Sequence, residues 1–305
     1  MEAESRRILF AKNQNAKLYP ASCTKILTAI TVIENADLEI IVEVDRRAQG
    51  VEGSSVYLRA GEHISVRELL YCLMLQSGND SAVALACHVC GGIEEFASLM
   101  NKTAERIGAI NSNFANPHGL HKDNHYTTAY DLGLISCYAL NNEEFSKIVS
   151  TKVIKVSNEG YDYKRVIVNK NKLLKRYEFA DGVKTGFTKK AGRCFVGSAT
   201  QKGMRLVAVV LNCGPMFEDA QSLLTFGFNN YISVNIIPKN KIFCMVDRGK
   251  TLIYRCDFRL NYPIKKDKSE DDLFETQLSV LKNSKLDLKV TFANNLIFSR
   301  QIGII

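Results

Sequence analysis

Two residues near the amino end, Ser22 and Lys25, have the types and spacing for nucleophilic chemistry. Residues three apart face the same side of a helix, so the hydroxyl and the amine can meet near the positive helix N-terminus. A free lysine has a pKa of about 10.4 and is a poor base at neutral pH. Burial or a second nearby cation would lower that pKa enough for the lysine to accept the serine proton. Alone, the Ser-x-x-Lys pattern is equally typical of a helix start with a solvated lysine.

Two further segments carry groups that could complete such a site, Ser77-Gly-Asn79 and Lys184-Thr-Gly186. The first falls at an expected break between two helices, which would free a hydroxyl and a carboxamide for other partners. In the second, Lys184 would supply a cation and Thr185 a donor, and Gly186 would let a ligand approach the backbone. Each segment alone also reads as an ordinary turn or a glycine at a strand bend.

The elements that must position these groups follow from the spacing of apolar residues. Helical spacing begins after Pro20 and continues through Ile26, Leu27, Ile30 and Ile33. Further helices are expected over 66–74, 81–89, 93–107, 130–140 and 222–228. Strands are expected over 7–11, 153–156, 163–168, 193–199 and 205–211. The mixture predicts an α/β domain.

Beyond residue 230 the pattern changes to short alternating runs. Strands are expected over 242–246, 252–260 and 286–292, with a charged loop over 265–272. We therefore expect a catalytic α/β domain over residues 1–230 and a small antiparallel β domain over residues 231–305.

Composition sets the broad class. The 305 residues are 46% hydrophobic and 24% charged, as in ordinary globular proteins, and 40 basic against 32 acidic residues give a net charge of +8. The excess positive charge favours an anionic setting such as an acidic polymer or a membrane surface. Nucleic acid is not indicated, because Trp is absent and no basic run is interleaved with aromatic residues. No apolar run approaches the roughly 18–20 residues of a membrane span.

The nine cysteines do not predict a disulfide scaffold, since they are few for this length and odd in number. Cys87 and Cys90 have CxxC spacing, but no second pair completes a four-ligand zinc site. We expect them to be small apolar residues on one helix face, and we expect no metal.

In this order, Ser-x-x-Lys, Ser-x-Asn and Lys-Thr-Gly are the motif set of serine β-lactamases and penicillin-binding proteins. The chain resembles the low-molecular-mass penicillin-binding proteins, which are serine-type D-alanyl-D-alanine carboxypeptidases (peptidase S11). The resemblance covers residues 5–230 and, more loosely, the β tail. It extends to the segments Asn116-Pro-His-Gly-Leu120, Tyr126-Thr-Thr-Ala-Tyr-Asp131 and Asp181-Gly-Val-Lys-Thr-Gly-Phe-Thr188. It implies an antiparallel sheet with helices on both sides, a helical subdomain and a C-terminal β module.

The resemblance also implies roles for individual residues. Ser22 would be the nucleophile and Lys25 its general base, Ser77 would relay a proton to the leaving D-alanine, and Asn79 would bond the substrate amide. Lys184, Thr185 and Gly186 would bind the substrate, with the terminal carboxylate on Lys184 and Thr185. The backbone N–H groups of Ser22 and Phe187 would form the oxyanion hole. The implied substrates are peptidoglycan stem peptides ending in D-Ala-D-Ala, β-lactams would acylate Ser22, and no cofactor is implied.

The chain departs from the family pattern at both ends. Family members usually have a strand before the N-terminal turn, so we expect a late start that omits a signal peptide and one strand. The resemblance implies an extracytoplasmic location in the cell envelope, yet no signal peptide precedes Ser5-Arg6-Arg7. The resemblance implies that membrane attachment is possible, but the chain ends at Ile304-Ile305 without the anchoring helix that such proteins often have, so we expect no residue of this chain to encode it.

Two other functions share these motifs. A serine β-lactamase would need a second base, and no Glu-x-x-x-Asn segment lies between Asn79 and Lys184, where Glu143-Glu144 is the nearest acidic pair. A catalytically silent wall-binding or partner-binding protein would keep the fold but need not keep all three motifs.

Four further residues are interpreted as structural. His118 and Asp131 are expected to brace loops, Cys23 to pack on its helix, and Arg205 to serve the fold rather than the substrate.

Overall fold

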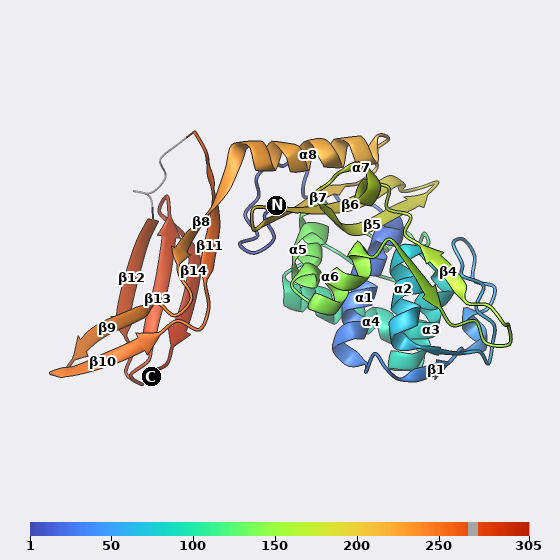
Figure 1. Ribbon diagram of the computed structural model, residues 1–305, viewed down its shortest axis with the longest axis horizontal. Helices are drawn as coiled ribbons and strands as arrows, with labels where there is room; N and C mark the ends of the chain where they lie inside the picture. The colour runs from blue at the N-terminus through green and yellow to red at the C-terminus, as the bar shows by residue number, and fades with distance from the viewer. Residues whose placement is uncertain (268–273, 305) are drawn as a thin grey trace. The chain divides into compact units, whose positions relative to one another are not determined.

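The computed structural model describes residues 1–267 and 274–304. The chain divides into two compact units, Met1–Phe226 and Gly227–Ile305 (Figure 1). Residues 268–272 of the expected charged loop lie outside the described residues.

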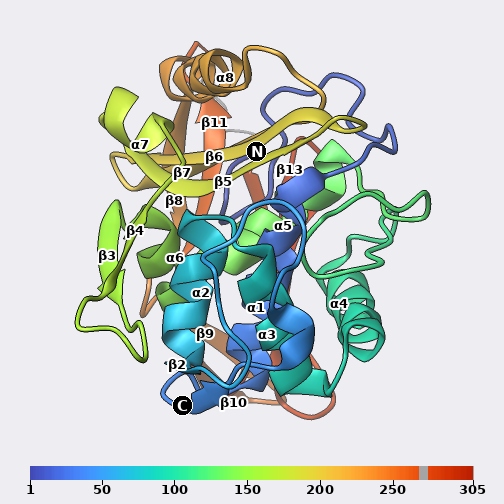
Figure 2. The same ribbon diagram turned by 90° about the vertical axis from the view of Figure 1, so that its right-hand side faces the viewer.

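A three-stranded antiparallel sheet forms the centre of the first unit. In spatial order its strands are β5 (Ala180–Thr188), β6 (Gly192–Gln201) and β7 (Met204–Val210). Helix α8 (Met216–Asn230) runs along one face, while α1 (Lys25–Asn35) and α5 (Ala129–Leu140) lie on the other (Figure 2). The apolar middle strand β6 is buried over most of its length because both faces of the sheet are covered. This arrangement confirms the expected α/β class with helices on both sides of an antiparallel sheet.

The helical part of this unit is organised around α1, whose residues 25–32 are all buried. Helix α2 (Val66–Leu75) begins at a capping box between Ser65 and Glu68. Helices α3 (Asn79–Cys90) and α4 (Ile93–Ile107) each end at a glycine with positive φ. The other elements are η1 (Ala21–Thr24), β1 (Ile41–Glu43), η2 (Arg46–Ala48), β2 (His63–Ser65), α6 (Glu143–Ser150), β3 (Val153–Val156), β4 (Arg165–Val168) and α7 (Leu173–Arg176).

The second unit is built from antiparallel strands. Its pairs are β8 (Tyr231–Ile237) with β11 (Leu260–Lys265), β9 (Ile242–Asp247) with β10 (Lys250–Arg255), and β12 (Phe274–Val280), β13 (Leu286–Phe292) and β14 (Asn295–Ile302) in sequence. Alternate residues of β13, among them Leu286, Leu288 and Val290, point into a separate core. The expectation of a β module is therefore confirmed for this part of the chain.

The strand expected over residues 7–11 is wrong. Residues 1–3 take the outer edge of β7 instead: the Ala3 N–H donates to Arg205 O and the Val207 N–H to Met1 O, each at 2.9 Å. The chain then turns back, and the Glu2 N–H donates to Arg7 O at 2.8 Å. Because residues 1–3 already occupy this edge of β7, residues 7–11 do not form a strand there.

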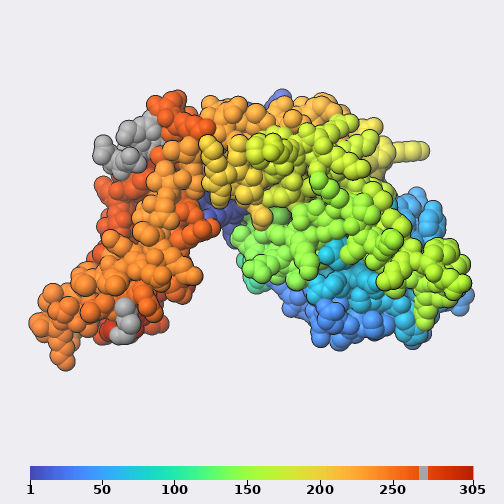
Figure 3. Space-filling view, viewed as in Figure 1, coloured from blue at the N-terminus to red at the C-terminus, as the bar shows by residue number. Residues whose placement is uncertain are grey.

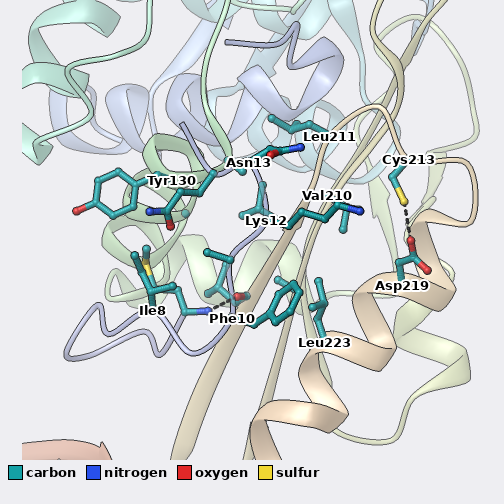
Figure 4. A pocket seen from close by; sticks show the side chains of 18 of the residues that line it. Ile8, Phe10, Lys12, Asn13, Tyr130, Val210, Leu211, Cys213, Asp219 and Leu223 are labelled. Atoms are coloured by element: carbon teal, nitrogen blue, oxygen red, sulfur yellow. Dashed lines mark hydrogen bonds between the residues drawn. The ribbon is translucent and has the colours of Figure 1, made fainter. Parts of the chain in front are cut away.

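Residues 8–11 instead line a cavity of about 830 Å³ beside β7 (Figure 4). Its walls also include Tyr130 from α5, Val210 from β7 and Leu223 from α8. The cavity is bounded by β7, whereas Ser22 lies against β5, the strand at the other edge of the sheet.

Two strand boundaries also differ from expectation. The Lys184 segment lies inside β5, although the sequence predicts a strand only after it, because Asp181, Gly182 and Gly186 are poor strand formers. The single strand expected over 252–260 is split, since β10 ends at Arg255 and β11 begins at Leu260.

None of the helices in the described residues is by itself long and apolar enough to cross a bilayer. Helices α3 and α4 reach that length and hydrophobicity only as a pair bent by 84°.

Candidate active site

The turn that carries Ser22 leads directly into the buried helix α1 and packs against β5. Ala21 precedes the serine with φ of +48°, an uncommon conformation for a residue with a side chain. Lys25 is the first residue of α1, is fully buried, and places Nζ 3.1 Å from Ser22 Oγ. The structure thus brings together the serine and the lysine that the sequence pairs.

Lys25 is held by two further oxygens. Its Nζ lies 2.7 Å from Asn79 Oδ1 and 2.6 Å from the backbone oxygen of His118. Burial lowers the pKa of Lys25 well below its ordinary value, and the positive charge of Lys184 lowers it further, while Asp80 opposes both effects. The environment therefore favours the neutral amine, which can accept a proton.

The Ser77 segment lies at the break between α2 and α3, as expected. Asn79 begins α3 and is fixed at both ends of its amide, since Nδ2 donates to Glu52 O at 2.6 Å while Oδ1 accepts from Lys25. Ser77 has φ of +65° and is 4% exposed. Among the described residues its hydroxyl is not hydrogen-bonded to Ser22 or Lys25, so the structure places it beside Asn79 without a direct link to the pair.

Strand β5 brings the third segment against Ser22. A Cβ added to Gly186 would lie 3.0 Å from the Ser22 nitrogen and 3.1 Å from Pro20 O. A side chain here would press on these backbone atoms, and the strand and the turn would have to move apart by a few tenths of an ångström. β5 is an outer strand of its sheet, and it contacts the turn that carries Ser22 at Gly186.

The side chains of β5 differ in burial. Lys184 is 1% exposed, its Nζ donates to Thr185 O at 3.1 Å, and burial lowers its pKa to about 8. Thr185 is half-buried, and Phe187 is 61% exposed with its ring near Arg193. Because the Phe187 ring is exposed, only the backbone of this residue is part of the outer strand β5 beside Ser22.

The loop over residues 116–120 is a part of the site that motif reasoning underestimated. The His118 ring is neutral, because burial lowers its pKa to about 3, and its Nδ1 accepts from the Leu120 N–H at 3.1 Å. Asn116 Oδ1 accepts from the N–H groups of His118 and Gly119. The expected bracing role of His118 is confirmed, but its backbone oxygen also contacts Lys25, a contact that no side-chain pattern encodes.

Gly119 packs this loop closely against the turn that carries Ser22. It has φ of +84°, and an added Cβ would lie 1.9 Å from Ala21 O. Any other residue here would displace the turn that carries Ser22.

His125 was missed by the sequence reasoning. Its Nε2 lies 2.8 Å from Thr24 Oγ1, and Thr24 Oγ1 in turn donates to Ala21 O at 2.8 Å. The Ala115 N–H donates to His125 Nδ1 at 3.1 Å, so the ring proton is on Nε2. The one available signal was that this histidine directly precedes the Tyr126–Asp131 segment.

Asp80 and Lys170 were also missed. Asp80 Oδ2 accepts from Ser55 Oγ at 2.5 Å and from the Val56 N–H at 2.9 Å, and so holds the segment beside Asn79. Lys170 Nζ donates to Ser54 Oγ at 3.3 Å, and its charge contributes to the lowered pKa values of Lys25 and Lys184.

The residues interpreted as structural have structural contacts. Asp131 accepts from Ser112 Oγ at 2.7 Å, and Arg205 contacts Asp181 at 3.2 Å. Cys23 is buried beside Lys184, and burial raises the pKa of its thiol.

The nine cysteines are free thiols. Within residues 1–267 and 274–304, no group of three or more His, Cys, Asp or Glu side chains is arranged to hold a metal ion. Cys87 and Cys90 lie half-buried in the last turn of α3.

An α/β unit in which a Ser-x-x-Lys turn packs against a Lys-Thr-Gly edge strand defines the penicillin-binding protein class. The chain belongs to the D-alanyl-D-alanine carboxypeptidase family, peptidase S11, whose sequence pattern matches residues 1–214. The resemblance noted in the sequence is therefore confirmed.

Curated relatives are identical to the chain at about a third of the aligned positions. D-alanyl-D-alanine carboxypeptidase DacF of Bacillus subtilis is 36% identical over an alignment of 254 residues that covers 81% of this chain and 65% of the relative. DacC of Escherichia coli is 35% identical over an alignment of 261 residues that covers 80% of this chain and 63% of the relative. The chain thus matches somewhat less than two thirds of the length of these relatives.

Solved structures show the same fold. Penicillin binding protein 5 from Haemophilus influenzae superposes with a TM-score of 0.81 at 26% identity, covering 100% of this chain and 94% of that one. A mutant of the Streptomyces K15 DD-transpeptidase has a TM-score of 0.70 at 31% identity, covering 75% of this chain and 95% of that one.

Proposed function

We propose that this protein is a serine D,D-carboxypeptidase that removes the terminal D-alanine from peptidoglycan stem peptides. The observation that carries the proposal is the buried Lys25 amine, 3.1 Å from Ser22 Oγ, with its pKa lowered by burial and by Lys184. The names of the curated relatives support the same reaction. The enzyme would act in the extracytoplasmic cell envelope, where this substrate is found.

In the acylation step, Lys25 Nζ takes the proton of Ser22 as Oγ attacks the carbonyl carbon of the penultimate D-alanine. The oxygen that becomes negative lies between the N–H groups of Ser22 and Phe187. The carbon–nitrogen bond then breaks as Lys25 returns this proton, through the Ser77 hydroxyl, to the leaving amine. Water attacks the resulting ester on Ser22 in a second step: Lys25 takes a proton from the water and gives it to Ser22 Oγ as the ester bond breaks.

Substrate binding follows from the free edge of β5. The terminal carboxylate would lie on the Lys184 ammonium and the Thr185 hydroxyl, and Gly186 lets β5 pack closely against the turn that carries Ser22. Asn79 Nδ2 carries a second N–H beyond the one given to Glu52 O, and this N–H would bond the substrate amide. A β-lactam presents a similar carboxylate and amide and would acylate Ser22, with slow release.

The test is the intact mass of the protein after incubation with benzylpenicillin, together with D-alanine release from a D-Ala-D-Ala peptide. We expect an adduct of one drug molecule and D-alanine release for the native chain, and neither for Ser22→Ala. Ser98→Ala, an exposed serine on α4, is the matched control and should behave like the native chain.

Each remaining outcome identifies another function. A folded protein that forms no adduct and leaves the drug intact would be a silent binding protein. Consumption of the drug without an accumulated adduct would instead indicate a β-lactamase.

A further inference from the structure

The β9–β10 hairpin of the second unit is apolar on both faces. Phe243, Met245 and Leu252 point inward and pack against the core of that unit. A strand with one buried face normally presents polar residues on the other. Here the outward residues include Val246, which is 74% exposed, and Ile242, which is 55% exposed.

The pairing of the two strands places residues of β10 on the same outward face as those of β9. Val246 lies opposite Thr251 and Cys244 opposite Ile253, and Ile253 is 43% exposed. Figure 3 shows the hairpin in orange at the edge of its unit, with its turn projecting outward. The exposed aliphatic residues are thus gathered on one projecting element.

The hairpin and the residues just before it are cationic. Residues 242–255 contain three basic residues and one acidic residue, Asp247, for a net charge of 3 − 1 = +2, and Lys239 and Lys241 lie in the three residues before β9. The basic residues are all exposed: Lys239, Lys241, Arg248, Lys250 and Arg255. Arg248 occupies the turn, and Arg255 lies opposite Ile242, so the charges surround the aliphatic face.

The positive charge of the hairpin and its exposed aliphatic residues together indicate which kind of partner it binds. A second copy of the hairpin would bring another net positive charge against this face and be repelled. An acidic polymer would satisfy the charges but leave the aliphatic residues in water. An anionic bilayer satisfies both, because basic residues bind its headgroups while aliphatic side chains enter the boundary with the acyl chains.

We propose that the β9–β10 hairpin binds the surface of anionic phospholipid bilayers, with Ile242, Val246 and Ile253 inserted below the headgroups. This binding is independent of the chemistry at Ser22. It would hold the second unit at a membrane surface without a spanning segment.

The absence of tryptophan from the chain allows a direct test. Val246→Trp introduces a unique fluorophore at the outward face, and Leu296→Trp, on β14 and 59% exposed, is the matched control. With vesicles of phosphatidylglycerol and phosphatidylcholine we expect a blue shift of emission for V246W and none for L296W. Vesicles of phosphatidylcholine alone should give no shift.

The contribution of charge is tested in the V246W background by Arg248→Gln and Lys250→Gln, with vesicle co-sedimentation as the readout. Each substitution should weaken partitioning about fivefold at low salt. Circular dichroism of every variant establishes that it is folded.

Three results would overturn the proposal. The first is an unchanged V246W emission with anionic vesicles. The second is co-sedimentation with polyphosphate while vesicles give no shift, which would indicate an acidic polymer as the partner. The third is a concentration-dependent shift without lipid, which would indicate self-association.

Discussion

The conformation of Ala21 is held by a chain of hydrogen bonds that ends at a buried histidine. Thr24 Oγ1 donates to Ala21 O and accepts from His125 Nε2, and the His125 ring is fixed by the Ala115 N–H. A non-glycine residue at positive φ costs roughly 1–3 kcal/mol and persists only when its surroundings hold it. His125 is therefore a positioning residue for Ser22.

Replacing His125 by Ala should slow acylation by benzylpenicillin about tenfold, because the turn that carries Ser22 loses one of its supports. Thr24→Val should have a similar effect, and the double variant should be no slower than either single one. The measurement is the second-order acylation rate of folded protein. His88→Ala, an exposed histidine on α3, should leave that rate unchanged.

The pH dependence of this loss distinguishes positioning from proton transfer. Burial lowers the pKa of His125 to about 4, so the ring is neutral throughout the working range. The ratio of native to H125A rates should be constant between pH 6 and 8. A ratio that changed with pH would show that His125 itself transfers a proton.

The two buried lysines predict opposite limbs of the pH profile. Lys184 has its pKa lowered to about 8, so its cation is present below that pH and is lost above it. Lys25 acts as a base only when neutral, which requires a pH above its own lowered pKa. We expect kcat/KM for a D-Ala-D-Ala peptide to rise with pH and to fall again above about pH 8. A profile that stays flat to pH 10 would contradict the carboxylate-binding role of Lys184.

At the scale of elements, sequence patterns located helices better than strands. Helix α1 follows from Ile26, Leu27 and Ile30, whose helical spacing reflects the buried face itself. Strand β5 does not follow, because Gly186, which lies against Ser22, and Gly182, which lies against Val149, lower its strand propensity. Residues that the site needs therefore make this strand hard to predict from sequence.

Helix α5 contains a glycine that its neighbours do not require. A Cβ added to Gly133 would meet Met1 Cε at 3.3 Å and Val209 Cγ2 at 3.9 Å, beside the cavity next to β7. The nearer atom is the end of a flexible side chain and can move. Gly133→Ala should raise the free energy of unfolding by about 0.5–1 kcal/mol, measured by urea denaturation. Destabilisation by this substitution would show that the β7 edge is rigidly packed.

At the scale of the whole molecule, the two units have separate cores. The core of the first unit lies between the sheet and α1 through α6, whereas that of the second lies on β13 and its neighbours. We propose that the units are independent domains with a boundary near residue 230.

A chain ending at Asn230 should therefore fold and be acylated by benzylpenicillin within about twofold of the full-length rate. Thermal unfolding followed by circular dichroism checks the fold, and intact mass checks the acylation. An unfolded product would refute the independence of the first domain, while a folded but unreactive one would assign the second unit a part in the reaction.

The motif residues were predictable from sequence because a hydroxyl, an amine and a carboxamide are properties of residue types. The oxygens that surround Lys25 were only partly predictable, since His118 contributes its backbone oxygen and any residue has one. Likewise, the contacts of Asp80 and His125 depend on loops whose paths are set by tertiary packing.

The basicity of Lys25 has a consequence for how the protein matures. Its surroundings come from residues 54 and 93 positions away along the chain, and Cys23 meets Lys184 across 161 positions. Contacts at such separations require large loops to close and form late in folding. Until they form, Lys25 is hydrated and protonated, and Ser22 is an ordinary alcohol. Penicillin labelling during refolding would therefore count native molecules alone and time the last step of their folding.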